Sequence, residues 1–383
     1  MKKVISVGFT VDKKKGYVTG LAMMHELFLS VINDSGYKAI PISLNPKNGS
    51  NCKVGSISVR RIFEYVYLVL LSIGTIICNP KSIFNTYPST TRGGFYRDLL
   101  FVIIAKICGD KIVLQQFGAL FNDFRLSLRK PERFLMKFVF SRVDAIFVEG
   151  DFAKKQIEFL KKNIVIPVPN GLPELIERPS STSKKINPDS VFCLLFMNNM
   201  IESKGYMDVL EAIDILVNKR KKNIRALFAG RFMKVVDDTK FSTVEDAEAW
   251  FEDFVNCRGL SKHVEYRPGI FDQDKVDAFN HSHVFLLPSY YKFEGQPTAI
   301  LEALSYGCVP IVTKYRLIPE MVNEKCACFV QARNPECIAD VVEQLIDNPD
   351  YYNKLSEAGI DRYENNYTKK KYQERVIKIL GNL

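Results

Sequence analysis

Short apolar runs alternate with helix-length amphipathic segments through almost the whole chain, and this alternation limits the possible fold more than any other feature. The expected strands are 3–9, 38–44, 82–85, 111–115, 145–148, 164–167, 191–196, 225–229, 264–266, 284–287 and 309–312. The expected helices include 18–33, 205–221, 244–257, 273–280, 298–306 and 368–380. Apolar strands separated by helices are typical of parallel sheets that are covered on both faces. The sequence therefore predicts an α/β protein built from doubly wound parallel sheets.

The alternation is interrupted once, and the interruption suggests a boundary between domains. Residues 173–188 contain Pro179 and a run of serine, threonine and lysine, which is linker composition. We expect a first Rossmann-like domain at 1–172, a linker at 173–189, a second Rossmann-like domain at 190–365 and a C-terminal helix at 366–383. That C-terminal helix is a candidate for crossing back to the first domain. Ligands of such sheets bind at the carboxyl ends of the strands, so the expected site is a cleft between the two domains.

The charge is concentrated in one half of the chain. The 383 residues include 53 Lys and Arg against 43 Asp and Glu, a net charge of +10. Residues 1–172 contain 25 basic and 12 acidic residues, a net charge of +13, whereas the remainder has a net charge of −3. Such asymmetry indicates an anionic partner, either nucleic acid or an anionic lipid surface. The basic residues are scattered over several predicted elements without a known nucleic-acid-binding module, so we expect no nucleic acid partner.

Cysteine usage and the N-terminus indicate a reducing compartment. The nine cysteines form no CxxC pair and a single CxC, at Cys326 and Cys328, unlike a secreted disulfide framework or a zinc ribbon. The chain begins with Met-Lys-Lys and a short strand, without a signal-peptide pattern. We therefore expect a cytoplasmic protein.

Residues 62–78 are almost wholly apolar, interrupted by Glu64 and Ser72. Seventeen residues are at the short limit for a bilayer span, and a glutamate near one end makes a span less favourable. The preferred interpretation is a buried helix. The alternative is an interfacial helix that docks on a membrane.

Motifs for dinucleotides, nucleotide triphosphates and metals are absent or weak. No GxGxxG follows the first strand and no Gly-Lys dipeptide occurs, which argues against a dinucleotide-dependent oxidoreductase and excludes a Walker A loop. The pair His281 and His283 lacks further convergent ligands. The pair Asp272 and Asp274 fits the first turn of a helix better than a metal–diphosphate motif. We expect neither a metal nor another cofactor.

Two segments of the second half carry the chemistry. The run Glu294-Gly-Gln-Pro-Thr-Ala-Ile-Leu-Glu302 leads from a strand into a helix, whose first backbone N–H groups suit a phosphate. Glu294 and Glu302 are separated well enough to bind sugar hydroxyls at opposite ends of a nucleotide sugar. The segment 196–205 places Lys204 where a strand meets the next helix, a position suited to clamping a diphosphate.

Together these residues resemble the retaining glycosyltransferases of glycosyltransferase family 4, which have the GT-B architecture. The resemblance covers most of the second domain and is looser in the first. Its markers are Lys204-Gly205, Pro288-Ser289, the Glu294/Glu302 pair, Glu302-Ala-Leu-Ser-Tyr-Gly-Cys-Val-Pro310 and Ile318-Pro-Glu320, with weaker matches at Pro169-Asn-Gly171, Ala229-Gly230, Gly269 and Gly16.

The resemblance implies a role for each matching residue. Lys204 would neutralise the donor diphosphate, Glu302 would hold the ribose, and Glu294 would contact the transferred sugar. Donor-binding positions implied beside these are Gly16, Asn199, Gly295, Gln296, Pro297 and Thr298. The family needs no divalent metal, and its leaving phosphate is thought to deprotonate the acceptor hydroxyl.

Two positions depart from the family pattern. Asn199 stands where the family usually has an arginine, which removes one positive charge from the diphosphate clamp. Gln116 stands nearest to a histidine that the family often carries in its first domain, and it is the acceptor-side candidate. These departures raise the odds of an altered donor or of a catalytically degenerate protein.

The resulting hypothesis is a retaining, metal-independent glycosyltransferase of surface polysaccharide biosynthesis, such as lipopolysaccharide O-antigen, capsule or exopolysaccharide. Its expected partners are a nucleotide-sugar donor and a glycan acceptor, with a lipid-linked glycan as one candidate. Basic residues interleaved with apolar ones at 125–142 fit a peripheral helix on anionic lipid about as well as a helix packed on the core. A nucleotide-sugar epimerase, a phosphorylase and a non-catalytic glycan-binding protein are the alternatives.

Overall fold

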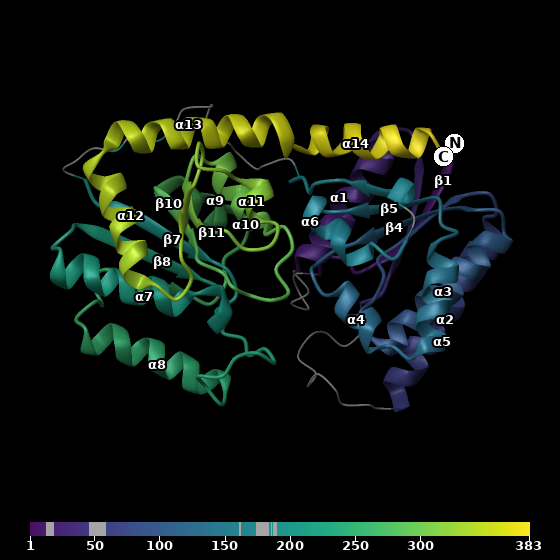
Figure 1. Cartoon of the computed structure of the whole chain (residues 1–383), viewed down its shortest axis with the longest axis horizontal. Helices are drawn as coiled ribbons and strands as arrows, with labels where there is room; N and C mark the ends of the chain where they lie inside the picture. Colours follow the sequence, from purple (N-terminus) through teal and green to yellow (C-terminus); the bar gives the residue numbers. More distant parts are fainter. Residues whose placement is uncertain (13–18, 46–58, 161, 174–183, 185, 187–189) are drawn as a thin grey trace. The chain divides into compact units, whose positions relative to one another are not determined.

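The computed structural model of the chain describes residues 1–12, 19–45, 59–160, 162–173, 184, 186 and 190–383. Its residues form two compact units (Figure 1). Unit 1 comprises Met1–Pro173 together with Lys369–Leu383, and unit 2 comprises Glu174–Thr368. The C-terminal segment therefore belongs to unit 1. Most of the expected linker at 173–189, and Gly16, lie outside the described residues.

Unit 1 contains a six-stranded parallel sheet in the order β2-β1-β3-β4-β5-β6. The strands are β1 (Lys3–Gly8), β2 (Lys38–Ser43), β3 (Ile83–Thr86), β4 (Lys111–Gln116), β5 (Ala145–Val148) and β6 (Val165–Pro167). Strands β3, β5 and most of β4 are fully buried, which explains why they read as unbroken apolar runs. All six strands match expected ones.

The helices of unit 1 form two layers. They are α1 (Gly20–Asp34), α2 (Val59–Cys78), α3 (Arg92–Ile107), α4 (Phe121–Ser127), α5 (Lys130–Phe140), α6 (Asp151–Lys154), the 3₁₀ turns η1 (Lys155–Ile157) and η2 (Lys162–Ile164), and α14 (Lys369–Gly381). Helix α14 packs beside α1 and buries Tyr372, Val376 and Leu380 in the same core as Phe28 and Val31 of α1. Helix α3 contacts β3 and β4 of the sheet and packs against both α2 and α5.

The expectation that residues 62–78 form a buried helix is wrong. The segment is helical as part of α2, but within it only Ser72 and Ile76 are buried. The helix contacts β1 and α3 along one narrow side, and no described element covers the other side. The apolar run therefore lies on the surface. None of the described helices, α2 included, is long and apolar enough to cross a membrane.

The basic and apolar residues at 125–142 lie on two helices rather than one. Helix α4 ends at Ser127, and α5 begins at Lys130 with Pro131 in its first turn. Proline is favoured there because the first helical N–H groups have no intrahelical partner. Helix α5 buries Met136, Val139 and Phe140. It exposes Phe134, Leu135 and Phe138. One side of α5 therefore packs on the core, as one interpretation expects, and another side is an exposed apolar surface, as the peripheral-helix interpretation expects.

Unit 2 contains a second six-stranded parallel sheet, in the order β12-β11-β10-β7-β8-β9. The strands are β7 (Phe192–Met197), β8 (Ile224–Ala229), β9 (Val264–Arg267), β10 (Val284–Leu287), β11 (Val309–Thr313) and β12 (Cys328–Val330). The sequence did not predict β12, because its three residues are too short to give a periodic signal.

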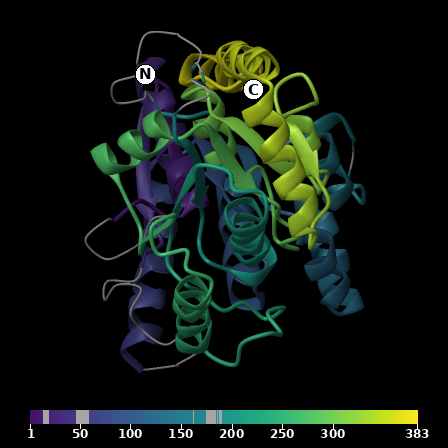
Figure 2. The same ribbon diagram turned by 90° about the vertical axis from the view of Figure 1, so that its left-hand side faces the viewer.

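Helices cover both faces of this second sheet. They are the 3₁₀ turn η3 (Glu202–Lys204), α7 (Tyr206–Asp214) with its π-helical continuation η4 (Ile215–Lys219), α8 (Val244–Cys257), α9 (Asp272–His281), α10 (Thr298–Ser305), α11 (Ile318–Met321), α12 (Pro335–Asp347) and α13 (Pro349–Asn366). One core joins α7, α8 and α12 to alternate strand residues such as Phe196, Phe228 and Leu286 (Figures 1 and 2). These helices consequently share one face of the sheet.

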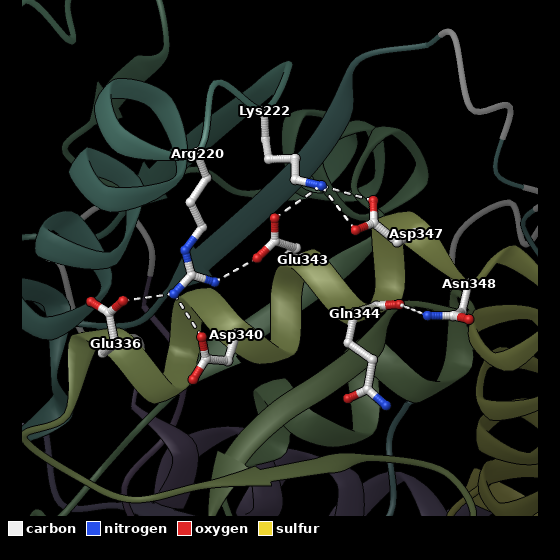
Figure 3. A network of polar contacts seen from close by, with 8 residues as sticks. All are labelled: Arg220, Lys222, Glu336, Asp340, Glu343, Gln344, Asp347 and Asn348. Atoms are coloured by element: carbon white, nitrogen blue, oxygen red, sulfur yellow. Dashed lines mark hydrogen bonds and ion pairs between the residues drawn. The ribbon is translucent and has the colours of Figure 1, made fainter.

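A network of charged side chains attaches α12 to the segment that follows η4 (Figure 3). Arg220 contacts Glu336, Asp340 and Glu343, each at 2.6 or 2.7 Å. Lys222 contacts Glu343 at 3.0 Å and Asp347 at 2.8 Å. The four acidic residues are spaced along a single face of α12, so two cations contact all four of them and offset half of their charge.

Both sheets are parallel, and helices pack against them in alternation with the strands, so the expected α/β class is confirmed. All eight cysteines among the described residues are free thiols. In unit 2 the strands β7, β10 and β11 end at the same edge of the sheet. The polar segments that follow these three strands meet there, so this edge is the place for a site.

Candidate active site

Two of the residues singled out from the sequence form a buried ion pair in unit 2. The Lys204 Nζ donates to Glu294 Oε1 at 2.8 Å and to Glu294 Oε2 at 2.9 Å. Lys204 ends the η3 turn after β7, and Glu294 lies in the segment between β10 and α10. Both side chains are buried. A buried charge is stable only with a close partner, so each of these two ions holds the other in place.

Hydroxyl groups from the neighbouring strand ends fix the Glu294 carboxylate. Ser289 follows β10, and its Oγ donates to Glu294 Oε2 at 2.6 Å. The Thr313 Oγ1 of β11 donates to the Ser289 carbonyl at 2.5 Å. The Tyr291 ring lies 5.0 Å from Lys204 Nζ, and burial, with Glu294 nearby, raises the pKa of its hydroxyl. The ion pair is thus part of a preorganised polar cluster.

Two glycines allow the backbone segments to approach at this edge. Gly205 adopts a φ of +85°, and a Cβ there would lie 2.7 Å from the Pro288 ring. Gly230 follows β8, and a Cβ there would lie 1.8 Å from the Asn198 carbonyl oxygen. A side chain at either position would push apart the strand ends that carry the cluster.

Glu302 lies in the second turn of α10 and forms its own ion pair. Its carboxylate is buried and contacts Lys275 Nζ of α9 at 2.5 Å. The sequence reasoning missed Lys275, which is 27 residues away from Glu302 along the chain. In the sequence, Lys275 is marked only by its place in the first turn of a predicted helix that follows a strand.

The other candidate donor residues of unit 2 lie at the same edge. Gln296 and Pro297 are buried, and Gly295 and Thr298 are partly exposed. Thr298 is the first residue of α10, whose leading N–H groups carry partial positive charge. Asn199 is exposed just beyond β7. The fold therefore places these residues after β7 and β10, in the segments that also carry Lys204 and Glu294.

In unit 1, Gln116 lies at the carboxyl end of β4 in a second polar cluster. Its Nε2 donates to the carbonyl groups of Phe117 and Gly118, at 2.9 and 2.8 Å, and its Oε1 is buried without a hydrogen bond from any described residue. Glu149 follows β5 and accepts hydrogen bonds from the Gly118 N–H at 2.9 Å and from Asn170 Nδ2 at 3.1 Å. Glu149 was not found from the sequence, because a lone glutamate after a strand carries no motif.

The histidine and aspartate pairs considered as metal ligands make structural contacts. His283 Nδ1 accepts a hydrogen bond from the Cys193 N–H at 2.9 Å, and its ring stacks on Phe192. Burial, and to a lesser extent the positive charge of nearby Lys184, lowers the pKa of His283 to about 4. Asp272 and Asp274 lie in the first turn of α9. Within the described residues, no group of three or more His, Cys, Asp or Glu side chains is arranged to hold a metal ion.

Part of the chain that includes this site is similar to known proteins. Residues 178–362 match the family model "Glycosyl transferases group 1". The capsular polysaccharide biosynthesis glycosyltransferase CapM of Staphylococcus aureus is 23% identical over 179 residues, which are 46% of this chain and 42% of CapM. This match thus spans less than half of either protein.

Solved structures resemble the whole chain. A glycosyltransferase from Rickettsia africae has a TM-score of 0.71 at 14% identity, with all of both chains covered. Anabaena HepE, solved in complex with UDP-glucose, has a TM-score of 0.69 at 9% identity, again over all of both chains. At such identities the likeness shows the fold. The chain thus has the GT-B fold of these glycosyltransferase structures, and its residues 178–362 are similar to the glycosyl transferases group 1.

Proposed function

We propose that this protein is a retaining, metal-independent glycosyltransferase that uses a nucleotide-sugar donor. The observation that carries the proposal is the buried cluster of Lys204, Glu294 and Ser289 at the carboxyl ends of the unit 2 strands, with Glu302 on the following helix. Ligands of doubly wound sheets bind at this edge. The group 1 match over residues 178–362 and the UDP-glucose complex of HepE support a nucleotide-sugar donor.

The proposed donor roles follow from the charges of the cluster. The Lys204 ammonium has three donors and is fixed by the Glu294 carboxylate, so it can stabilise negative charge that develops on a departing diphosphate. The first N–H groups of α10 add partial positive charge for the distal phosphate. Glu302 accepts from the ribose hydroxyls, and the 2.5 Å contact with Lys275 orients the Glu302 carboxylate.

The reaction proposed at this site breaks the bond between the sugar anomeric carbon and the diphosphate. The same anomeric carbon forms a bond with an acceptor hydroxyl oxygen on the face that the diphosphate leaves. The leaving phosphate takes the hydroxyl proton, so the protein supplies no separate base. Glu294 orients the sugar, and Ser289 fixes Glu294 by the 2.6 Å hydrogen bond. Catalysis here depends on positioning and on charge stabilisation.

For the acceptor we propose a growing surface glycan, with a lipid-linked glycan at the cytoplasmic face of the membrane as the first candidate. The partial match to CapM, named for capsular polysaccharide biosynthesis, supports this class. Gln116 and Glu149, at the carboxyl edge of the unit 1 sheet, are the proposed acceptor-side residues because their amide and carboxylate groups suit sugar hydroxyls.

A second candidate function is a binding protein without catalysis. Asn199 is exposed where the family pattern has an arginine, so the donor site has one positive charge fewer. Such a protein would bind a nucleotide sugar and neither transfer nor hydrolyse it. An epimerase would instead return an altered nucleotide sugar without any acceptor.

One experiment separates these functions. UDP-, GDP- and ADP-sugars are screened by thermal shift, because a ligand of the folded state raises its melting temperature. The stabilising donor is then incubated with candidate acceptors in EDTA, and the products are analysed by NMR. We expect a glycoside with the anomeric configuration of the donor. Lys204→Ala and Glu302→Ala are expected to weaken donor binding, and Glu294→Ala to slow turnover. Wild-type behaviour of all three variants would refute the site assignment.

A further inference from the structure

The exposed apolar side chains of the described residues gather on three helices of unit 1. Fifteen of the 23 exposed large apolar side chains belong to α2, α3 or α5. Among them Phe63 of α2 is 70% exposed, Ile107 of α3 is 79% exposed and Phe134 of α5 is 71% exposed. Monomeric proteins rarely leave so many large apolar groups together in water without a partner. We call this surface the α2–α3–α5 face.

The exposed apolar residues of α3 form one stripe with helical periodicity, whereas those of α2 spread over most of the circumference of that helix. On α3 the exposed residues are Tyr96, Leu100, Ile103 and Ile107, with spacings of four and three. On α2 they are Ile62, Phe63, Tyr65, Val66, Tyr67, Leu70, Leu71 and Ile77. Residues three and four apart share one side of a helix. Helix α3 packs against both α2 and α5, so the exposed apolar residues lie on neighbouring helices.

A groove runs between α3 and α5 in this face. It has a volume of about 250 Å³, and its lining is almost wholly apolar, with Ile103, Ile107 and Phe138 among its walls. Two cations, Lys106 and Arg142, complete the lining. The Arg142 guanidinium lies 3.5 Å from the centre of the Phe138 ring. An apolar groove beside two cations matches one acyl chain below an anionic headgroup.

Exposed charge around the face has one sign. Between residues 92 and 144 the exposed cations are Arg92, Lys106, Lys111, Arg129, Lys130, Lys137 and Arg142, whereas Asp123 is the single exposed anion. Most other acidic side chains of this stretch are occupied locally. Asp98 pairs with Arg97 at 2.7 Å, Asp144 contacts Lys106 and Lys111, and Glu132 accepts from the Tyr96 hydroxyl. The face is therefore both apolar and cationic.

We propose that the α2–α3–α5 face docks the protein on an anionic lipid surface, with the α3–α5 groove taking one lipid chain. A bilayer satisfies both properties at once, because apolar side chains enter the acyl boundary while Lys and Arg reach the headgroups. A second copy of this chain fits less well, since its own face would bring the same positive charge. The inference rests on the proposed function only where it takes the acceptor to be lipid-linked.

Vesicle flotation tests the proposal with the full chain. We expect wild-type protein to bind vesicles of phosphatidylcholine with phosphatidylglycerol, and to bind pure phosphatidylcholine vesicles at least about tenfold more weakly at low salt. The variant Phe63→Ser/Leu70→Ser removes apolar contacts from α2, and Lys130→Glu/Lys137→Glu reverses charge on α5. Each is expected to lower the partition coefficient for anionic vesicles by about tenfold or more.

Matched controls change the same residue types elsewhere. Val236→Ser and Lys262→Glu alter exposed residues of unit 2 and are expected to bind vesicles as the wild type does. Thermal shift with the donor shows that every variant is folded, and failure of that shift alone would count against the proposed function. Absence of vesicle binding in the wild type, or binding by the α2 and α5 variants as strong as that of the wild type, would overturn the docking proposal. A dimer in solution that Phe63→Ser/Leu70→Ser dissolves would also overturn it.

Discussion

Each unit contains a six-stranded parallel sheet, but the two units differ in where their charged side chains lie. In unit 2, Lys204 pairs with Glu294, Lys275 with Glu302, and Arg220 and Lys222 with the acidic side of α12. In unit 1, exposed cations surround an exposed apolar face on α2, α3 and α5. Paired internal charges suit a site that must hold a defined geometry, whereas an apolar and cationic surface suits an external anionic partner.

This contrast gives meaning to the uneven net charge. Residues 1–172 carry +13 and the remainder carries −3. The excess charge lies in the unit with the exposed apolar face, and the near-neutral unit carries the ion-paired candidate site. Changes in one unit should therefore leave the property of the other intact, and each prediction below uses that separation.

The largest effect is expected from Glu294→Gln. The substitution keeps the shape of the side chain but removes the negative charge that fixes Lys204 Nζ at 2.8 Å. Loss of one preorganised electrostatic group lowers kcat by about 10²–10³-fold. Steady-state transfer kinetics measure this, with Glu324→Gln at an exposed ion pair of the same unit as control. Vesicle binding by the variant should equal that of the wild type, and unchanged kcat would contradict the assigned role.

His283→Gln is expected to change how the stability of unit 2 depends on pH. The folded-state pKa of His283 is lowered from 6.5 to about 4, chiefly by burial, so the unfolded chain takes up the proton first as pH falls. The neutral ring stabilises the fold fully above pH 6.5, and that stability is lost between 6.5 and about 4. The loss over this whole range amounts to about 3 kcal/mol.

The measurement uses the one tryptophan of the chain, Trp250 on α8, whose fluorescence reports unfolding of unit 2. Urea unfolding at neutral pH and near pH 4.5 gives the two stabilities. We expect the difference to shrink in His283→Gln, and to persist in His281→Gln, which alters an exposed histidine of the same segment. Equal pH dependence in the wild type and His283→Gln would be inconsistent with this account.

Lys275→Met tests whether the second ion pair supports the donor site. Without the ammonium, the buried Glu302 carboxylate loses its 2.5 Å partner and is no longer held in one orientation. We expect the nucleotide Kd to rise about tenfold, and Lys275→Arg to restore much of the affinity. Calorimetric titration gives the Kd of each variant, and recovery of affinity in Lys275→Arg but not in Lys275→Met identifies a positioning effect. Lys262→Met is the control at an exposed lysine.

The smallest effect is expected from Arg220→Met, which removes the cation shared by Glu336, Asp340 and Glu343 (Figure 3). Those partners are partly exposed, so water and salt screen the contacts. The free energy of unfolding of unit 2 should fall by about 1 kcal/mol, and by less at high salt. Trp250 fluorescence follows it, with Lys314→Met at an exposed pair as control.

The sequence was informative where function depends on local pattern. The strands that surround both sites were found because buried parallel strands are apolar throughout, as in β4 and β10. Lys204 and Glu294 were found because they lie at the ends of such strands. Their direct contact across 90 residues could not be read from spacing.

Other features depend on tertiary structure and gave no sequence signal. An apolar helix such as α2 reads as buried, and only the packing of its neighbours shows that one side lacks cover. Lys275 and Glu149 are ordinary charged residues until the fold brings Glu302 or Gly118 beside them.

The central claim is that the ion-paired edge of unit 2 binds a nucleotide sugar. Isothermal titration of the full chain with the donor that gives the largest thermal shift tests it directly, comparing wild type, Glu302→Ala and Glu149→Ala. We predict that Glu302→Ala raises the donor Kd by about tenfold or more, since its carboxylate would lose the ribose hydroxyls. Glu149→Ala, at the unit 1 edge, should bind the donor as the wild type does. Equal affinity in all three proteins, or loss of affinity confined to Glu149→Ala, would contradict the claim.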